Sequence, residues 1–109
     1  MQVTYSEKAR ESREGYALLQ RATERLEEIV RRSLDPVTAE WDRTQDDGEP
    51  LYTLRLADWS GSATVDFRPK DLGDSGRLDN RLYRVWDELL EIRSHKLLER
   101  LRGSGESEE

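Results

Sequence analysis

The feature that most constrains this chain is a change of hydrophobic period, from helical near both ends to strand-like in the middle. Before residue 35, apolar residues recur every three or four positions, which predicts one face of an amphipathic helix. Thr4 and Glu7 have the spacing of a capping box, so we expect this helix to begin there. It should end at Asp35-Pro36, because the residue before a proline avoids the helical conformation. The apolar face comprises Tyr16, Leu19, Ala22, Leu26, Ile29 and Val30.

Three segments that follow alternate apolar and polar residues, which is typical of half-buried strands. They are separated by Asp46-Asp47-Gly48 and by residues 58–62, both of which have the composition of turns. Short sequential strands of this kind indicate an antiparallel meander with one apolar and one polar face. The residues expected on the apolar face are Val37, Ala39, Trp41, Tyr52, Leu54, Leu56, Ala63, Val65 and Phe67.

A second helix is predicted after the strands, and its apolar surface is longer and wider than that of the first. Asp74 or Ser75 is the expected N-cap and Gly103 the expected C-cap. From Leu78 to Leu101 this helix would measure about 36 Å, whereas a six-residue strand spans only about 20 Å. The overhanging apolar surface therefore needs a partner, either the other helix or a second molecule. Its apolar residues are Leu78, Leu82, Val85, Trp86, Leu89, Leu90, Ile92, Leu97, Leu98 and Leu101.

These patterns predict a two-layer α+β fold of order α-β-β-β-α, with both long helices on one face of a three-stranded antiparallel sheet. Residues 1–102 should form a single domain. Within it, residues 1–14 are polar nearly all round, apart from Ala9, and are expected to be prone to fraying. Residues 103–109 are expected to form a disordered acidic tail.

Composition limits the functions open to such a fold. Hydrophobic residues make up only 34% of the chain and charged residues 39%, against about 25% charged residues in an average globular protein. The core should therefore be thin, which favours association that buries further surface. The net charge is −6, and residues 35–76 alone hold four basic and ten acidic residues. This distribution argues against nucleic acid as a partner, because phosphate contacts need Lys and Arg.

The sequence also lacks cysteine residues, a recognisable signal peptide and a membrane-spanning apolar run. The absence of cysteine excludes disulfides, thiolate zinc sites and cysteine nucleophiles. The first residues do not resemble a signal peptide, and no apolar run approaches the length of about 20 residues needed to span a bilayer. We therefore expect a cytoplasmic protein with no membrane partner.

No segment carries a recognisable catalytic or cofactor-binding motif, so we expect no catalytic residue, no cofactor and no metal site. The residues around Asp74 could bind an anion beside Arg77, but helix capping explains them without a ligand. Glu91, His95 and Glu99 share one helix face and could hold a divalent metal; a solvated charge ladder is the favoured interpretation. An enzyme would need its chemistry from Asp and Glu alone, or from a partner chain.

The surfaces predicted to bind partners lie on the second helix and at a hairpin tip. The wide apolar face of the helix predicts a homodimer whose interface includes Trp86, Leu90, Leu97 or Leu101. Trp59, near the tip of the second hairpin, is either a binding anchor or a cover for the end of the core.

The polar face of the sheet should carry Glu40, Asp42, Arg55 and Asp66. The favoured interpretation is a cross-strand network in which Arg55 bridges acids on both sides. Binding of a basic protein is a second interpretation, and a Mg²⁺ site for phosphoryl chemistry is a third. Taken together, the sequence predicts a non-catalytic interaction module that self-associates as a homodimer. The alternative is an acidic inhibitor or immunity-type protein that binds a basic protein partner through the β region.

Overall fold

Four strands and four helices make up the part of the chain that the computed structural model describes, residues 1–107, with side chains described for residues 1–102. This arrangement confirms the predicted α+β class. In chain order the elements are β1 (Gln2–Tyr5), α1 (Glu7–Glu11), α2 (Arg13–Val30), β2 (Thr38–Asp46), β3 (Glu49–Asp58), β4 (Gly61–Phe67), α3 (Pro69–Gly73) and α4 (Ser75–Ser107).

The strands form one mixed sheet in the order β1-β2-β3-β4. The predicted meander is present, because β2–β3 and β3–β4 are both antiparallel and place Trp41 opposite Leu54 and Leu54 opposite Val65. The first hairpin turns at Asp47 and Gly48, which have φ angles of 52° and 75°. Two successive residues with positive φ are what a two-residue hairpin turn of type I′ requires.

Strand β1 occupies the place where the first helix was expected to begin, so the prediction of a helix start at Thr4 is wrong. Gln2–Tyr5 pairs in parallel with the first residues of β2. Helix α1 is capped instead by Ser6, whose Oγ accepts a backbone N–H of the first turn at 3.1 Å. The physical reason is that Val3 and Tyr5 alternate with polar residues and pack against the core. That burial, together with backbone pairing to β2, outweighs the capping-box spacing.

The first helix is also interrupted, at Ser12, where the sequence predicts a continuous one. Ser12 caps α2 by accepting the N–H of Gly15 at 3.1 Å. A β-carbon on Gly15 would lie 1.9 Å from the hydroxyl oxygen of Tyr52, so the helix passes this close to β3 only because residue 15 has no side chain. Helix α2 then ends at Val30, short of the expected end at Asp35-Pro36.

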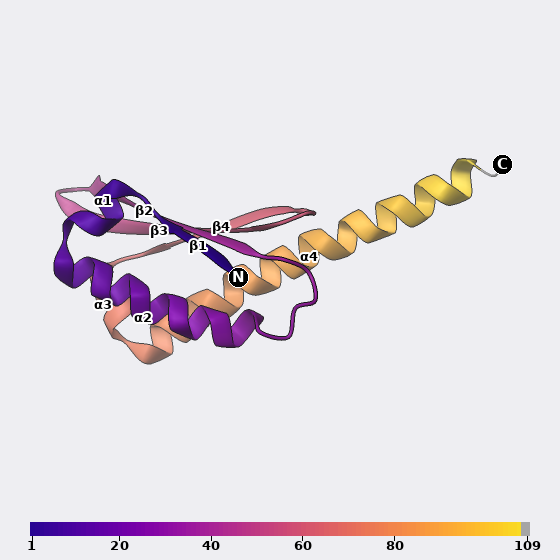
Figure 1. Cartoon of the computed structure of the whole chain (residues 1–109). Helices are drawn as coiled ribbons and strands as arrows, with labels where there is room; N and C mark the ends of the chain where they lie inside the picture. Colours follow the sequence, from indigo (N-terminus) through magenta and orange to yellow (C-terminus); the bar gives the residue numbers. More distant parts are fainter. Residues whose placement is uncertain (108–109) are drawn as a thin grey trace.

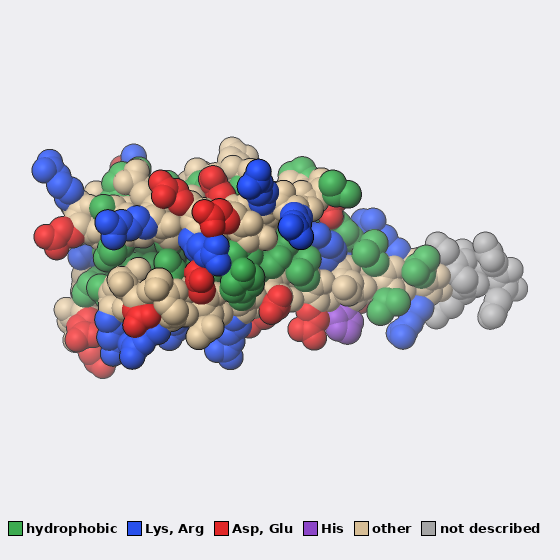
Figure 2. All heavy atoms as spheres, turned by 90° about the horizontal axis from the view of Figure 1, so that it is seen from below, with side chains coloured by type: hydrophobic (Ala, Val, Ile, Leu, Met, Phe, Trp, Pro, Cys, Tyr) green, Lys and Arg blue, Asp and Glu red, His purple; other side chains and the backbone are tan. Residues whose placement is uncertain are grey.

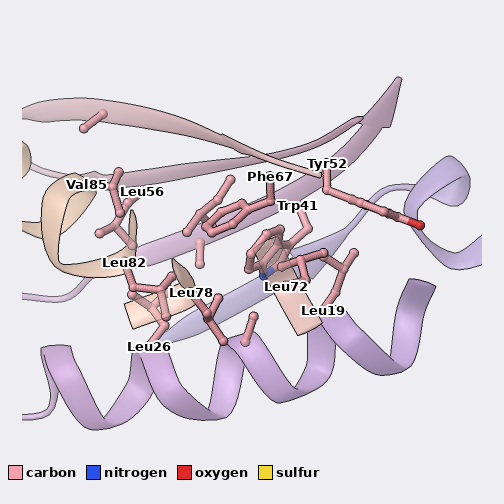
Figure 3. Close-up of a cluster of buried hydrophobic side chains, with 14 of the residues drawn as sticks. Leu19, Leu26, Trp41, Tyr52, Leu56, Phe67, Leu72, Leu78, Leu82 and Val85 are labelled. Carbon is pink, nitrogen blue, oxygen red and sulfur yellow. The ribbon is translucent and has the colours of Figure 1, made fainter. Parts of the chain in front are cut away.

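Helices α2 and α4 lie on the same face of the sheet, as predicted, and no helix of the described chain covers the other face (Figure 1). Alternate strand residues meet the apolar faces of both helices in one core (Figure 3). Thr23 lies within this core, where its hydroxyl donates to the carbonyl of Leu19 at 2.8 Å and accepts the indole N–H of Trp41 at 2.9 Å. The largest fully buried side chains are Trp41, Phe67, Leu19, Leu26, Leu54, Leu56, Leu82, Leu89 and Val85.

Helix α4 starts where the sequence predicts, but the short helix α3 precedes it. Pro69 opens α3, and Asp71 accepts the backbone N–H of Arg68 at 2.9 Å. Asp74 Oδ1 accepts the backbone N–H groups of Gly76 and Arg77 at 3.0 and 3.1 Å. Asp74 rather than Ser75 therefore caps α4, and the capping interpretation of this segment is confirmed.

The length of α4 sets the outline of the molecule, whose extents are 58 × 27 × 22 Å. Figure 1 shows its C-terminal part projecting beyond the sheet. Because α4 is assigned as far as Ser107, it does not end at Gly103 as predicted. The expected acidic tail, residues 103–109, lies outside the residues whose side chains the structure describes. The single domain over residues 1–102 stays a prediction.

Candidate interaction surface

The predicted apolar surface of the second helix divides into a part that packs in the core and a part that leaves the body of the protein. Leu78, Leu82, Val85 and Leu89 of α4 are buried, whereas every residue from 94 to 102 is exposed. We call residues 94–102 the α4 extension. Figure 2 shows apolar side chains along it. The large hydrophobic side chains exposed in the α4 extension are Leu97, Leu98 and Leu101, which are 47%, 51% and 70% exposed.

Three of the predicted interface residues share one side of α4. Leu90, Leu97 and Leu101 are seven and four residues apart, which places them in one stripe on a helix. Trp86 precedes Leu90 by one turn, and both are half-buried, with Trp86 packed against the core. The stripe therefore runs from the body into the α4 extension. Leu98 was not among the interface residues predicted from the sequence, although an apolar residue in so charged a segment is a usable signal.

An ion-paired group fixes α4 at the point where it leaves the sheet. Arg93 donates from Nη2 and Nε to Oδ2 of Asp58 at 2.7 and 2.9 Å. Its Nη1 lies 3.4 Å from Oδ2 of Asp35, and its guanidinium lies 5.6 Å from the ring of Trp86. The side chains of Asp58 and Arg93 are 0% and 15% exposed. Arg93 thus ties α4 to the β3–β4 turn and to the loop that precedes β2.

The pKa of Asp58 reflects this environment. Burial is the largest single influence on the pKa and raises it. Hydrogen bonds from Ser60 and Arg93 act in the opposite direction and together outweigh burial, so the pKa of Asp58 lies below its ordinary value. Asp58 is therefore ionised at neutral pH, which suits an ion pair and not a proton donor.

Trp59 contacts the α4 extension rather than the end of the core. The indole is 43% exposed, and the guanidinium carbon of Arg100 lies 4.6 Å from the ring centroid. This distance is within the range of a cation–π contact. In the same turn, a β-carbon on Gly61 would lie 3.1 Å from Cγ2 of Ile92. The tip of the β3–β4 hairpin therefore supports the α4 extension from one side.

The three acidic residues predicted on the polar face, Glu40, Asp42 and Asp66, are exposed there. Arg55 pairs with Glu40, with 3.2 Å between Nη1 and Oε2. It does not bridge to Asp66, because the strand register places Arg55 opposite Thr64 instead. The predicted network thus forms on one side of Arg55 only.

The other two carboxylates of this face accept hydrogen bonds from hydroxyl groups. Asp66 Oδ1 accepts from Thr53 Oγ1 at 2.9 Å, and Asp42 Oδ1 accepts from Ser6 Oγ at 2.6 Å. The bond from Ser6 is the main cause of a lowered pKa at Asp42. These carboxylates are thus partly satisfied within the chain, although they remain open to solvent.

The described residues form neither a metal-binding cluster nor a membrane-spanning helix. In residues 1–102, no three His, Asp or Glu side chains lie close enough together to hold a metal ion, and Glu91, His95 and Glu99 do not form such a group. Among the described helices, none has the length and apolar character needed to cross a membrane. No protein-family model matches this sequence, and no curated protein is significantly similar to it.

Proposed function

We propose that this protein is a non-catalytic interaction module that self-associates as a homodimer through the apolar stripe of α4. The supporting observation is the α4 extension, where Leu97, Leu98 and Leu101 are exposed to solvent. Complete burial of one leucine side chain is worth about 1.5–3 kcal/mol. Burial of these side chains in each of two chains favours association, and it is opposed by the loss of translational and rotational freedom.

A second copy of the chain suits this stripe better than an unrelated helix. Leu90, Leu97 and Leu101 follow the spacing of a coiled-coil seam, which averages about 3.5 residues. A two-fold axis brings the same stripe from both chains together, so one set of residues serves both sides of the interface. The contacts of Arg93 and Trp59 hold the extension in place beforehand, which lowers the entropic cost of association.

Light scattering coupled to size exclusion tests this proposal between micromolar and near-millimolar concentration. We expect a dimer for the wild type and a folded monomer for the Leu97→Glu/Leu101→Glu double variant, because both side chains are exposed within one chain. His95→Glu is the matched control, since it adds a carboxylate to the same extension on a different side of the helix. A wild type that stays monomeric, or a double variant that stays dimeric, contradicts the proposal.

A second candidate function is that of an acidic inhibitor or immunity-type protein for a basic protein. What favours it is the outer face of the sheet, where Glu40, Asp42 and Asp66 are exposed and no described helix covers them. It ranks second because these carboxylates already accept bonds from Arg55, Ser6 and Thr53.

Such binding should be strong at low salt and weak at high salt, because opposite charges steer the encounter. The Asp42→Asn/Asp66→Asn variant should bind a purified small basic protein much more weakly than the wild type does. Equal binding by the two proteins would exclude this role for the outer face.

A further inference from the structure

A groove lined mainly by cationic side chains lies between α3 and the first turns of α4. Its volume is about 530 Å³. Five cationic side chains line it, those of Arg68, Lys70, Arg77, Arg81 and Arg84, against the single carboxylate of Asp71. We call it the basic groove. Its lining carries five positive charges and one negative charge in a chain whose net charge is −6.

The sequence places these cations together by two local patterns. Arg77, Arg81 and Arg84 are four and three residues apart, so they project from one face of α4. Arg68 and Lys70 flank Pro69 at the start of α3, which packs against α4. A concave surface lined by one sign of charge concentrates oppositely charged ligands.

The one acid in the groove does not saturate its cations. Asp71 is nearly buried, with its side chain 7% exposed, and it accepts the backbone N–H of Arg68 at 2.9 Å. The guanidinium nitrogens of Arg81 and Arg77 lie 3.6 and 3.8 Å from it, too far for hydrogen bonds. By contrast, Arg93 meets Asp58 at 2.7 Å. Guanidinium N–H donors in the groove therefore remain available to a ligand.

Two further cations have no acidic partner of their own. Lys70 and Arg84 are exposed, and no carboxylate in the described part of the chain lies within 4.0 Å of either charged group. Arg81 is held in place, since its Nη1 donates to the backbone carbonyl of Asp66 at 2.8 Å. The groove thus combines anchored and free cations, an arrangement suited to a ligand with several anionic oxygens.

We propose that the basic groove binds a small ligand bearing two or more phosphate charges. Arginine forks match the geometry of phosphate oxygens, and lysine adds a point charge. A small ligand is favoured over a nucleic acid because acidic residues flank the groove: Asp46 and Glu49 pair with Arg68, and Asp74 lies beside Arg77. Backbone phosphates running beyond the groove would meet these carboxylates.

This site is independent of the proposed dimer. At 3.6 residues per turn, the basic face of α4 and the stripe of Leu97 and Leu101 lie on roughly opposite sides of the helix. Phosphate binding can therefore succeed or fail without affecting the oligomeric state.

Titration of the ¹⁵N-labelled protein with pyrophosphate, at constant ionic strength, tests the proposal. We expect saturable chemical-shift changes confined to residues 68–84. The Lys70→Gln/Arg84→Gln variant should bind about tenfold more weakly or worse, as expected when charge-assisted hydrogen bonds are lost. Arg31→Gln/Arg32→Gln is the matched control, because it removes the same charge at exposed positions away from the groove and should leave binding unchanged.

Three results would overturn the proposal. The first is shifts that grow without saturation or spread over the whole protein, which indicate general ionic effects. The second is equal weakening in the two double variants. The third is tighter binding to a short single-stranded RNA, or to vesicles containing phosphatidic acid, than to soluble pyrophosphate, because either identifies a ligand of another class.

Discussion

At the residue scale, the ion pair between Asp58 and Arg93 is the most buried one in the described residues, and it joins α4 to the end of β3. Replacing Asp58 with Asn leaves the guanidinium of Arg93, 15% exposed, without its main partner. Loss of one partner of a largely buried pair should lower the free energy of unfolding by about 2–4 kcal/mol. Urea denaturation measures this. Asp66→Asn on the exposed face is the control, with an expected change below about 1 kcal/mol.

The same carboxylate makes stability depend on pH. The pKa of Asp58 is lower in the folded protein than in the unfolded chain, where it is about 3.9. Its contribution to stability is therefore present above that value and lost as pH falls through the folded-state pKa. Unfolding measured between about pH 5 and pH 2 should show a shallower loss of stability for Asp58→Asn than for the wild type. Parallel curves would mean that Asp58 is not preferentially ionised in the folded state.

Close packing against Tyr52 leaves no room for a side chain at Gly15. Gly15→Ala should destabilise the fold by about 1–3 kcal/mol, because the new methyl group would meet the hydroxyl of Tyr52. Tyr52→Phe in the same chain should recover part of that loss, since the ring carbon that remains lies 3.0 Å away. Thermal unfolding of the two single variants and the double variant gives the coupling energy. Additive effects would show that helix propensity, and not this contact, governs residue 15.

At the element scale, hydrophobic period was a reliable guide wherever it was sustained over several turns or strands. It predicted α2, α4 and the β2–β3–β4 meander, together with the face on which the helices pack. It failed at β1, because four residues are too few to distinguish an edge strand from the polar start of a helix. The break at Ser12 was not predicted either, and the close approach of Gly15 to Tyr52 beside it involves a residue from a distant strand.

The candidate interaction surface could likewise be predicted from the sequence only in part. Leu97 and Leu101 could be identified from the length of the helix relative to the sheet, which is a local comparison. The contact of Trp59 with Arg100 could not, because nothing in the sequence relates a hairpin tip to a helix position 41 residues later. Contacts of this kind depend on how the elements dock, which local patterns do not encode.

The hairpin tip should control how firmly the α4 extension is held. Trp59→Ala removes the ring that faces Arg100, so backbone amides of residues 97–102 should exchange with solvent severalfold faster. Global stability should fall by only about 1 kcal/mol. Hydrogen exchange at low protein concentration measures the effect without contribution from a dimer. Arg100→Gln should reproduce it and Arg102→Gln should not; equal exchange in all variants would mean that the tip gives no support.

At the scale of the whole molecule, the two halves of α4 differ: the first half packs in the core, and the second half extends beyond it into solvent. The sheet and the first half of α4 enclose a core of modest size, as expected when only 34% of residues are hydrophobic. The second half of α4 adds apolar surface that the core cannot use. We therefore expect a partner to stabilise the folded chain by covering the apolar side chains of the α4 extension, without a change in the rest of the fold.

Self-association through the α4 extension should make thermal stability depend on protein concentration. If the dimer forms only from folded chains, mass action raises Tm as concentration increases. Wild-type Tm should therefore rise by several degrees between micromolar and near-millimolar protein, given that about 1 kcal/mol shifts Tm by about 4–8 °C in a domain of this size. Leu97→Glu/Leu101→Glu should give a Tm that does not change with concentration and that equals the wild-type value at high dilution, because neither leucine is buried in one chain. A concentration-independent wild-type Tm, or a variant with lower Tm at high dilution, would show that these leucines serve the monomer's own stability and not association.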